Sequence, residues 1–237
     1  MILSVKDLSL AYVNAHKQIS KVLLANLNFD FTPGNFMGLL GKNGSGKTTL
    51  LKTLSGVMEP WQGQIYLENH SLYDLAPLAR ARVVAMVTTV WPSNMLLSGR
   101  DVLLLGRYPY LAGLSYRKED HDLICELAEI LKIQDFLDRP FFELSDGQRQ
   151  KIMIGRALAQ KTKFIFLDEP FTYLDMTQKD WLFDFLRKYA HEQQVGVLFS
   201  THDRFIVDQL DTVLALDHKG SGTILGREHI QEYLASF

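Results

Sequence analysis

The chain has 237 residues, 47% of them hydrophobic, and a formal net charge of −2. This length suits one large domain or one domain plus a subdomain, and the near-neutral charge gives no electrostatic reason to expect nucleic acid as a partner. Apolar runs such as 83–87 and 164–167 are far shorter than the ~18 residues of a membrane-spanning helix.

The first ninety residues predict β structure around one helix. Residues 1–40 alternate apolar and polar side chains between turn signals, which predicts antiparallel strands, and 36–40 reads as a short buried strand. Apolar residues at helical spacing follow at 48–54, and further short strands are predicted at 63–67 and 83–87. The chain start alternates like a strand and lacks the pattern of a secretory signal, so we expect a cytosolic protein.

The second half predicts a helical insertion and then a return to the sheet. Residues 101–142 carry leucine and isoleucine at three-to-four spacing among charged residues, which predicts a helical subdomain. An apolar strand at 164–167, a helix at 179–189 and a strand at 195–200 then predict βαβ units with both sheet faces covered. The only cysteine, Cys125, lies in the helical region and is expected to pack there.

The segment between the strand at 36–40 and the helix at 48–54 carries the strongest chemical signal. It matches the pattern G-x-x-x-x-G-K-T, in which small residues let backbone N–H groups converge, a lysine supplies a mobile charge and a hydroxyl ligates Mg²⁺. Strand, loop and helix in this order also point the positive end of the helix dipole at the ligand. The predicted cradle for a nucleotide triphosphate consists of Gly41, Lys42, Asn43, Gly44, Ser45, Gly46, Lys47, Thr48 and Thr49.

Two adjacent carboxylates follow the predicted strand at 164–167. Asp168 and Glu169 would emerge at the carboxyl edge of the sheet, where open α/β sheets bind ligands. Because neighbours on an extended strand point in opposite directions, one carboxylate can serve Mg²⁺ and the other the attacking water. The alternative interpretation is a pair of strand-end charges facing solvent.

A third segment, 144–150, reads L-S-D-G-Q-R-Q. Taken alone it is a common capping box, with Ser145 as the N-cap and Gln148 three residues on. Taken in chain order, the motif segments resemble those of the ATPase subunit of an ABC transporter, over almost the whole chain: 41–48, 144–150, 164–170 and 200–203.

This resemblance implies an α/β fold of the P-loop NTPase class, with a mostly parallel core sheet, an N-terminal antiparallel β subdomain and an inserted α-helical subdomain. A single ATPase domain would span 1–237. About 1–90 and 160–237 would form the catalytic core with its β subdomain, and about 91–159 the helical subdomain.

The resemblance also implies a role for each motif residue. Lys47 would hold the β- and γ-phosphates of ATP, and Thr48 and Asp168 would ligate Mg²⁺. Glu169 would polarise the attacking water and His202 would reach the γ-phosphate, so the catalytic set is Glu169, His202 and Lys47. The implied ATP-binding set, in which Tyr12 stacks on adenine, is Tyr12, Gly41, Asn43, Gly44, Ser45, Gly46, Lys47, Thr48, Thr49, Ser145, Gly147 and Gln148.

Three of the matched residues have simpler interpretations. Tyr12 could be an ordinary strand aromatic, and His202 could cap a turn. Asp175 matches the acid of the family's D-loop but could equally be the N-cap of the helix that begins near Thr177, and both can be true.

The chain departs from the family pattern in three places. Residues 144–150 match the signature segment of the family, and Asp146 stands where that segment usually has glycine. We therefore expect its carboxylate to point away from phosphate or to cap the helix. In the segment that matches the D-loop, Tyr173 stands where the family usually has a small residue. Thr89 is nearest to the position where the family has a glutamine that contacts Mg²⁺ and links the ATPase to its membrane partner.

The signature segment would lie far from the ATP of its own copy, so the resemblance implies a head-to-tail dimer. Each ATP would lie between the Lys47 loop of one copy and Ser145 and Gly147 of the other. Integral membrane permease subunits would receive the motion at the cytoplasmic face of the cell membrane, and a substrate-binding protein would act through them. A docking groove is predicted from Trp91, Met95, Leu96, Leu97 and 105–111, with internal packing as the alternative.

Residues 106–110, Gly-Arg-Tyr-Pro-Tyr, are similar to a segment of importers for iron–siderophore complexes, haem or cobalamin. The implied function is ATP hydrolysis that powers such a metal-chelate importer through dimer closure and opening. The alternatives are a soluble ABC ATPase of iron–sulfur cluster assembly and the ATPase subunit of an exporter. A DNA-repair ATPase is disfavoured because no sustained heptads separate the motifs.

Overall fold

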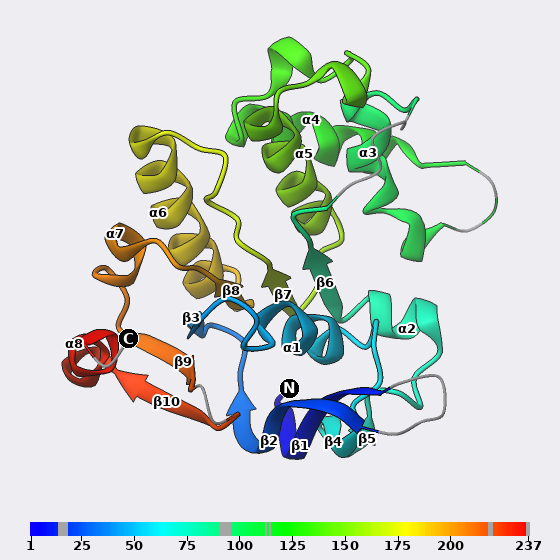
Figure 1. Cartoon of the computed structure of the whole chain (residues 1–237). Helices are drawn as coiled ribbons and strands as arrows, with labels where there is room; N and C mark the ends of the chain where they lie inside the picture. The colour runs from blue at the N-terminus through cyan, green and yellow to red at the C-terminus, as the bar shows by residue number, and fades with distance from the viewer. Residues whose placement is uncertain (14–18, 91–95, 112, 114, 218–219, 236–237) are drawn as a thin grey trace.

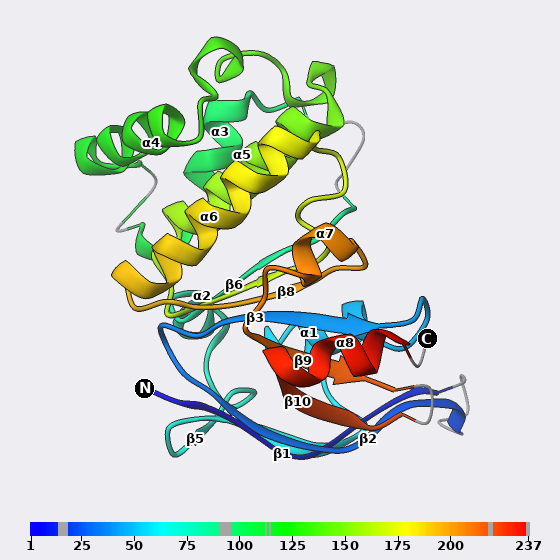
Figure 2. The same ribbon diagram turned by 90° about the vertical axis from the view of Figure 1, so that its left-hand side faces the viewer.

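The computed structural model describes residues 1–13, 19–90, 96–111, 113, 115–217 and 220–235. Figure 2 shows three layers: helices, a central sheet beneath them, and a second sheet at the bottom. The predicted α/β class with a mostly parallel core is confirmed.

The central sheet has six strands in the order β10-β9-β3-β8-β7-β6. Strands β9, β3, β8, β7 and β6 run parallel, and β10 pairs antiparallel with β9 at one edge. Every residue of β7 and β8 is buried, as expected for strands covered on both faces. The strands are β3 (Phe36–Gly41), β6 (Val84–Val87), β7 (Phe164–Leu167), β8 (Gly196–Ser200), β9 (Thr212–Leu216) and β10 (Gly222–Gly226).

The second sheet is antiparallel, in the order β2-β1-β4-β5. Its inner face packs on the helix α1 (Lys47–Leu54) and on one face of the central sheet, and Leu24, Leu50 and Phe166 share this core. The predicted antiparallel β structure is confirmed for the first two strands, whereas 36–40 belongs to the central sheet. The strands are β1 (Leu3–Val13), β2 (Ile19–Phe31), β4 (Gln62–Leu67) and β5 (His70–Ser71).

Helices cover the other face of the central sheet, and α3, α4 and α5 gather together at the top of Figure 1. Leucine, isoleucine and phenylalanine side chains from α3 to α6 and from the sheet form one continuous core. The helices are α2 (Pro77–Ala81), α3 (Gly99–Leu105), α4 (Lys118–Ile130), α5 (Asp146–Ala159), α6 (Met176–Glu192), α7 (Arg204–Val207) and α8 (Arg227–Ala235).

Two sequence predictions need correction in this layer. The helix predicted at 179–189 runs from Met176 to Glu192, because Asp175 caps it by accepting a hydrogen bond from the backbone N–H of Gln178. Cys125 was expected to pack inside, but it is exposed on α4, where Ile124 and Leu127 face the core. Within the described part of the chain, no helix is both long and apolar enough to cross a membrane.

Candidate functional site

The predicted phosphate-binding loop joins β3 to α1 at the carboxyl edge of the central sheet. Gly44 and Gly46 have φ angles of 80° and 99°, which a residue with a Cβ rarely adopts, so glycine is needed for the turn into α1. Nζ of Lys47 donates to the carbonyl oxygens of Gly41 at 2.7 Å and Lys42 at 3.2 Å. The Lys47 side chain therefore folds back over the loop, where its ammonium group would meet a bound phosphate.

The side chain of Lys47 is only 7% exposed. Burial lowers the pKa of Lys47 below its ordinary value, and the carboxylates of Glu169 and Asp168 oppose that shift. An anion bound at the loop would add another charge that favours the protonated lysine. Ser45 Oγ is buried without a hydrogen-bond partner among the described residues, so the loop retains hydrogen-bonding capacity for a ligand.

Asp168 follows β7 and is joined to the loop by a hydroxyl. Thr48 Oγ1 donates to Asp168 Oδ2 at 2.7 Å, across 120 residues of sequence. Ser200, the last residue of β8, donates to the other oxygen, Oδ1, at 2.7 Å. The sequence assigned Thr48 and Asp168 to one ligand set, and the structure places them in contact. The sequence analysis gave Ser200 no role, although a polar residue at the end of a buried strand was a usable signal.

Glu169 diverges from Asp168 for a different reason than the one the sequence suggested. The strand β7 ends at Leu167, and Glu169 has a left-handed φ of 45° rather than an extended backbone. Thr172 Oγ1 donates to Glu169 Oε2 at 3.1 Å, and His202 Nδ1 lies 3.1 Å from Oε1. The carboxylate is thus held on both oxygens, and the interpretation as free strand-end charges fails.

His202 lies between β8 and α7, and it does not cap the turn there. The neighbouring Asp203 is the N-cap of α7, since its carboxylate accepts a hydrogen bond from Phe205 N–H. Asp203 also pairs with Lys179 of α6. Burial alone would raise the pKa of Asp203, but the hydrogen bond and charge of Lys179 outweigh it and hold that pKa below its ordinary value. His202 is left mostly exposed, with Glu169 as its contact.

The signature segment forms the start of α5. Ser145 and Gln148 form the predicted capping box, each side chain bonding the other's backbone N–H. Asp146 points to Arg149, whose guanidinium lies 3.1 Å from the Asp146 carboxylate. The segment lines a cavity of about 590 Å³ that includes no residue of the phosphate-binding loop: Phe136, Ser145, Asp146, Gly147, Gln148, Lys151, Tyr173, Asp175 and Gln178.

Tyr12 is the last residue but one of β1. It pairs with Lys21 of β2 and is 53% exposed. Two residues further along β2, Leu23 packs against the loop: a Cβ built on Gly46 would lie 3.3 Å from it. The strand pair therefore brings Tyr12 to the neighbourhood of the loop without a direct contact.

The predicted docking groove is only partly a surface. Gly106 has no room for a side chain, since a Cβ there would lie 2.2 Å from the carbonyl oxygen of Arg156. The Tyr110 hydroxyl donates to the Gln160 carbonyl at 2.9 Å. Leu96, Leu97, Leu105 and Tyr108 are exposed, whereas Trp91 and Met95 lie outside the described residues. Within 105–111 only Leu105 and Tyr108 are exposed, so internal packing accounts for most of this segment.

The segment after β6 carries Thr88 and Thr89, at the place where the resemblance predicts a glutamine. Thr88 Oγ1 donates to the carbonyl oxygen of Val90 at 3.0 Å, and Thr89 is half-buried. The described contacts give Thr89 no link to Asp168 or Glu169.

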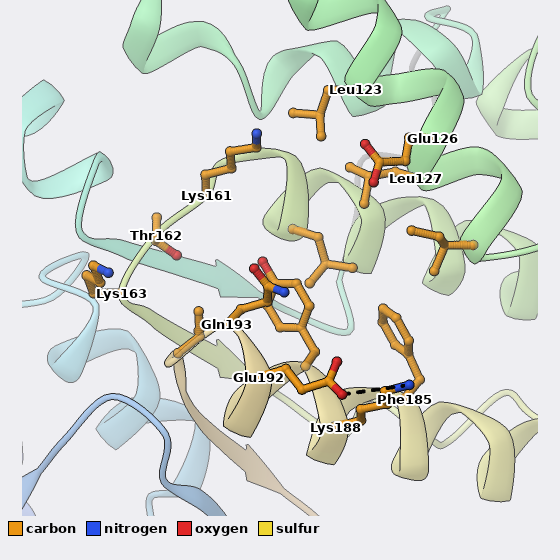
Figure 3. A pocket seen from close by; sticks show the side chains of 14 residues that line it. Leu123, Glu126, Leu127, Lys161, Thr162, Lys163, Phe185, Lys188, Glu192 and Gln193 are labelled. Atoms are coloured by element: carbon orange, nitrogen blue, oxygen red, sulfur yellow. Dashed lines mark ion pairs between the residues drawn. The ribbon is translucent and has the colours of Figure 1, made fainter.

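A second cavity of about 590 Å³, shown in Figure 3, lies at the opposite edge of the sheet. Side chains of α4, α6 and the segment after α5 surround it, among them Leu127, Phe185 and the ion pair of Lys188 with Glu192. It is bordered by Lys163 and Val195, which precede β7 and β8, whereas the carboxylates follow β7. This cavity is therefore separate from the candidate site.

The family model of the ABC transporter matches residues 24–172. An uncharacterized ABC transporter ATP-binding protein of Methanocaldococcus jannaschii is 37% identical over 92% of this chain and 74% of its own length. The manganese transport system ATP-binding protein of Synechocystis is 34% identical over 85% and 75% of the two lengths. The iron(3+)-hydroxamate import ATP-binding protein of Bacillus subtilis is 32% identical over 77% and 68%.

A solved structure agrees in fold as well as in sequence. It is the inward-facing conformation of a transporter assigned to the metal-chelate type, with a TM-score of 0.80 and 30% identity over 99% of this chain and 87% of that chain. The match extends beyond the motif loops to nearly the whole length of the chain. The chain therefore belongs to the ABC transporter family, as one of its P-loop ATPases.

Proposed function

We propose that this chain hydrolyses ATP to power an importer of metal chelates. The observation that carries the proposal is the placement of Glu169, held by His202 and Thr172, beside the Asp168–Thr48 pair at the end of the phosphate-binding loop. A basic lysine, a paired carboxylate and hydroxyl, and a second fixed carboxylate are the groups that phosphoryl transfer to water requires.

The donor set suits Mg²⁺ as the cofactor. Thr48 and Asp168 present a hydroxyl and a carboxylate oxygen 2.7 Å apart, and hard oxygen ligands are those that Mg²⁺ prefers. These two residues would hold the ion. When bound, it would neutralise charge on the β- and γ-phosphates.

The protein's own residues would do the remaining work. Lys47 would exchange its two carbonyl contacts for phosphate oxygens, and Gly44 and Gly46 would let backbone N–H groups approach them. Glu169 would accept a hydrogen bond from the attacking water, and His202 would orient that carboxylate and reach the γ-phosphate. Tyr12 would stack on the adenine.

The signature segment supports a head-to-tail dimer. Ser145, Gly147 and Gln148 line a cavity that the chain's own phosphate-binding loop does not share, so they are available to the ATP of a second copy. ATP would hold the two copies closed, and hydrolysis would release them. Residues 91–159 would move as a helical subdomain relative to a core of 1–90 and 160–237.

The motion requires a membrane partner. We propose integral permease subunits that dock on exposed apolar side chains of the helical layer, at the cytoplasmic face of the membrane, with a substrate-binding protein delivering cargo to them. The relatives named for iron(3+)-hydroxamate import and for the metal-chelate type support a chelate as cargo, and the manganese relative makes a free ion the competing outcome.

The test is transport by the intact complex. The chain would be purified from membranes with its partners and reconstituted in vesicles, and ATP-dependent uptake of ferric hydroxamate, haem, cobalamin and Mn²⁺ would be compared. Uptake of one chelate that stops when the complex carries Glu169→Gln supports the proposal. Purification without any membrane subunit, or export of cargo, would refute import.

A further inference from the structure

Ser200 occupies a central place at the carboxyl edge of the sheet. It ends β8, which pairs with β3 on one side and with β7 on the other. The strand β3 leads into the phosphate-binding loop, and β7 leads to the two carboxylates. The side chain of Ser200 is 0% exposed, so its hydroxyl meets protein groups and not solvent.

The hydroxyl of Ser200 bridges both carboxylate residues. It accepts a hydrogen bond from the backbone N–H of Glu169 at 2.9 Å and donates one to Asp168 Oδ1 at 2.7 Å. A serine hydroxyl has one donor and two acceptor positions, so both bonds form at once. The second Asp168 oxygen is taken by Thr48, and the carboxylate is therefore fixed in its plane from two sides.

The backbone of Glu169 needs such a support. Its φ of 45° lies in the left-handed region, which residues with a Cβ rarely occupy and which persists only where the surroundings hold it. The hydrogen bond from Glu169 N–H to Ser200 fixes the peptide plane just before that unusual angle.

Not every buried hydroxyl of this sheet bonds to a residue distant in sequence. Thr162, at the opposite edge, is also buried, and its hydroxyl donates to the carbonyl oxygen of Phe164, two residues away. The partners of Ser200 lie 31 and 32 residues away, and both belong to the candidate site.

We propose that Ser200 is a positioning residue for ATP hydrolysis. Its hydroxyl orients the Asp168 carboxylate toward the metal and, through the backbone of Glu169, aims the second carboxylate at the attacking water. This inference rests on the roles proposed above for Asp168 and Glu169.

The test compares Ser200→Ala with Ser200→Thr, which restores a hydroxyl, in the full-length protein. Ser55→Ala is the matched control, because Ser55 is also buried and, among the described residues, its hydroxyl bonds to Lys52 and Met86 and to no group of the candidate site. Steady-state hydrolysis gives kcat and KM for ATP, thermal unfolding gives Tm, and electron paramagnetic resonance gives the Kd for Mn²⁺ in the presence of ADP. Glu169→Gln is measured alongside.

We expect Ser200→Ala to lower kcat about 10- to 100-fold and to weaken Mn²⁺ binding about tenfold, with KM for ATP unchanged. Ser200→Thr should recover most of both, and Ser55→Ala should match the wild type. Wild-type kcat and Mn²⁺ affinity in Ser200→Ala would overturn the inference, as would equal losses in the Ala and Thr variants. If Glu169→Gln keeps full activity, the proposed base is wrong instead.

Discussion

Nδ1 of His202 lies 3.1 Å from Oε1 of Glu169, and Thr172 Oγ1 donates to the other oxygen at the same distance. The histidine follows β8 and the glutamate follows β7, so two parallel strands bring together residues 33 positions apart. An ionised carboxylate only accepts hydrogen bonds, so this contact requires a proton on Nδ1 of His202. The pair should therefore act as a unit.

The first prediction is a double-mutant cycle on this pair. Glu169→Gln should lower kcat about 10²- to 10⁴-fold while ATP still binds, because the acceptor for the water proton is lost. His202→Ala should also lower kcat, and the double variant should be no slower than Glu169→Gln alone. Single-turnover hydrolysis and ATP binding by filter assay would measure both effects.

The matched control is a histidine–glutamate pair away from the site. Glu228 and His229 on α8 lie 3.7 Å apart and are both exposed. Glu228→Gln and His229→Ala should leave kcat unchanged. If the fold-loss of kcat in the double variant equals the product of the losses in Glu169→Gln and His202→Ala, the two residues act independently and the prediction is wrong.

The second prediction concerns the extra carboxylate of the signature segment. Arg149 neutralises Asp146 and also donates to the carbonyl oxygens of Phe141 and Phe142. In a Glu169→Gln background, Arg149→Ala should raise the ATP concentration needed for half dimerisation about tenfold, which corresponds to about 1.4 kcal/mol. The physical reason is repulsion between the uncovered Asp146 and an incoming phosphate.

Adding Asp146→Asn to Arg149→Ala separates charge from packing. The second change removes the repulsion but leaves the lost carbonyl contacts, so dimerisation measured by light scattering should recover. Failure to recover would assign the effect to the packing of 141–142 instead.

The loops of the candidate site could be recognised in the sequence because their patterns are local. The glycines that let the chain turn into α1 all lie within 41–48. The capping box of Ser145 and Gln148 spans only four consecutive positions. The buried strand β7 was predicted to the residue, and β3, β6 and β8 to within one residue, since a short apolar run between polar ends has one simple interpretation.

What the sequence could not supply depends on contacts between distant segments. The left-handed backbone of Glu169 and its tie to Ser200 exist only once β7 and β8 pair, so alternation along one strand gave the wrong reason for the divergence of the carboxylates. In the same way, the sequence left 105–111 open between a docking groove and internal packing, because only the neighbouring α5 shows which side of the segment is packed.

The third prediction tests the ion pair that fixes this segment to α4. Arg107 lies 2.7 Å from Asp120, with side-chain exposures of 13% and 11%, and it also donates to the Ala159 carbonyl. Burial alone would raise the pKa of Asp120, but the hydrogen bond and charge of Arg107 hold it below the ordinary 3.8. Asp120→Asn should lower the free energy of unfolding by about 3 kcal/mol at pH 7, because it leaves the buried guanidinium of Arg107 without its carboxylate.

The sign of the pH dependence follows from the lowered pKa. The stabilisation by ionised Asp120 is complete above pH 3.8 and is lost as the pH falls through the lower folded-state pKa. The difference in unfolding free energy between wild type and Asp120→Asn should therefore narrow only below pH 3.8. Urea unfolding at several pH values measures it. Asp184→Asn, which breaks an exposed pair with Arg187, should cost less than about 1 kcal/mol. Equal costs for the two variants would contradict the prediction.

The fourth prediction uses two tyrosines two positions apart with opposite environments. Tyr108 is 60% exposed, whereas Tyr110 stacks under the Arg107 guanidinium at 4.2 Å and bonds Gln160. Tyr108→Asp should leave the unfolding midpoint and basal ATP hydrolysis unchanged but abolish co-purification with the membrane subunit. Tyr110→Phe should cost about 1 kcal/mol of stability and leave that association intact. A Tyr108→Asp chain that still purifies as a complete transporting complex would place the docking surface elsewhere.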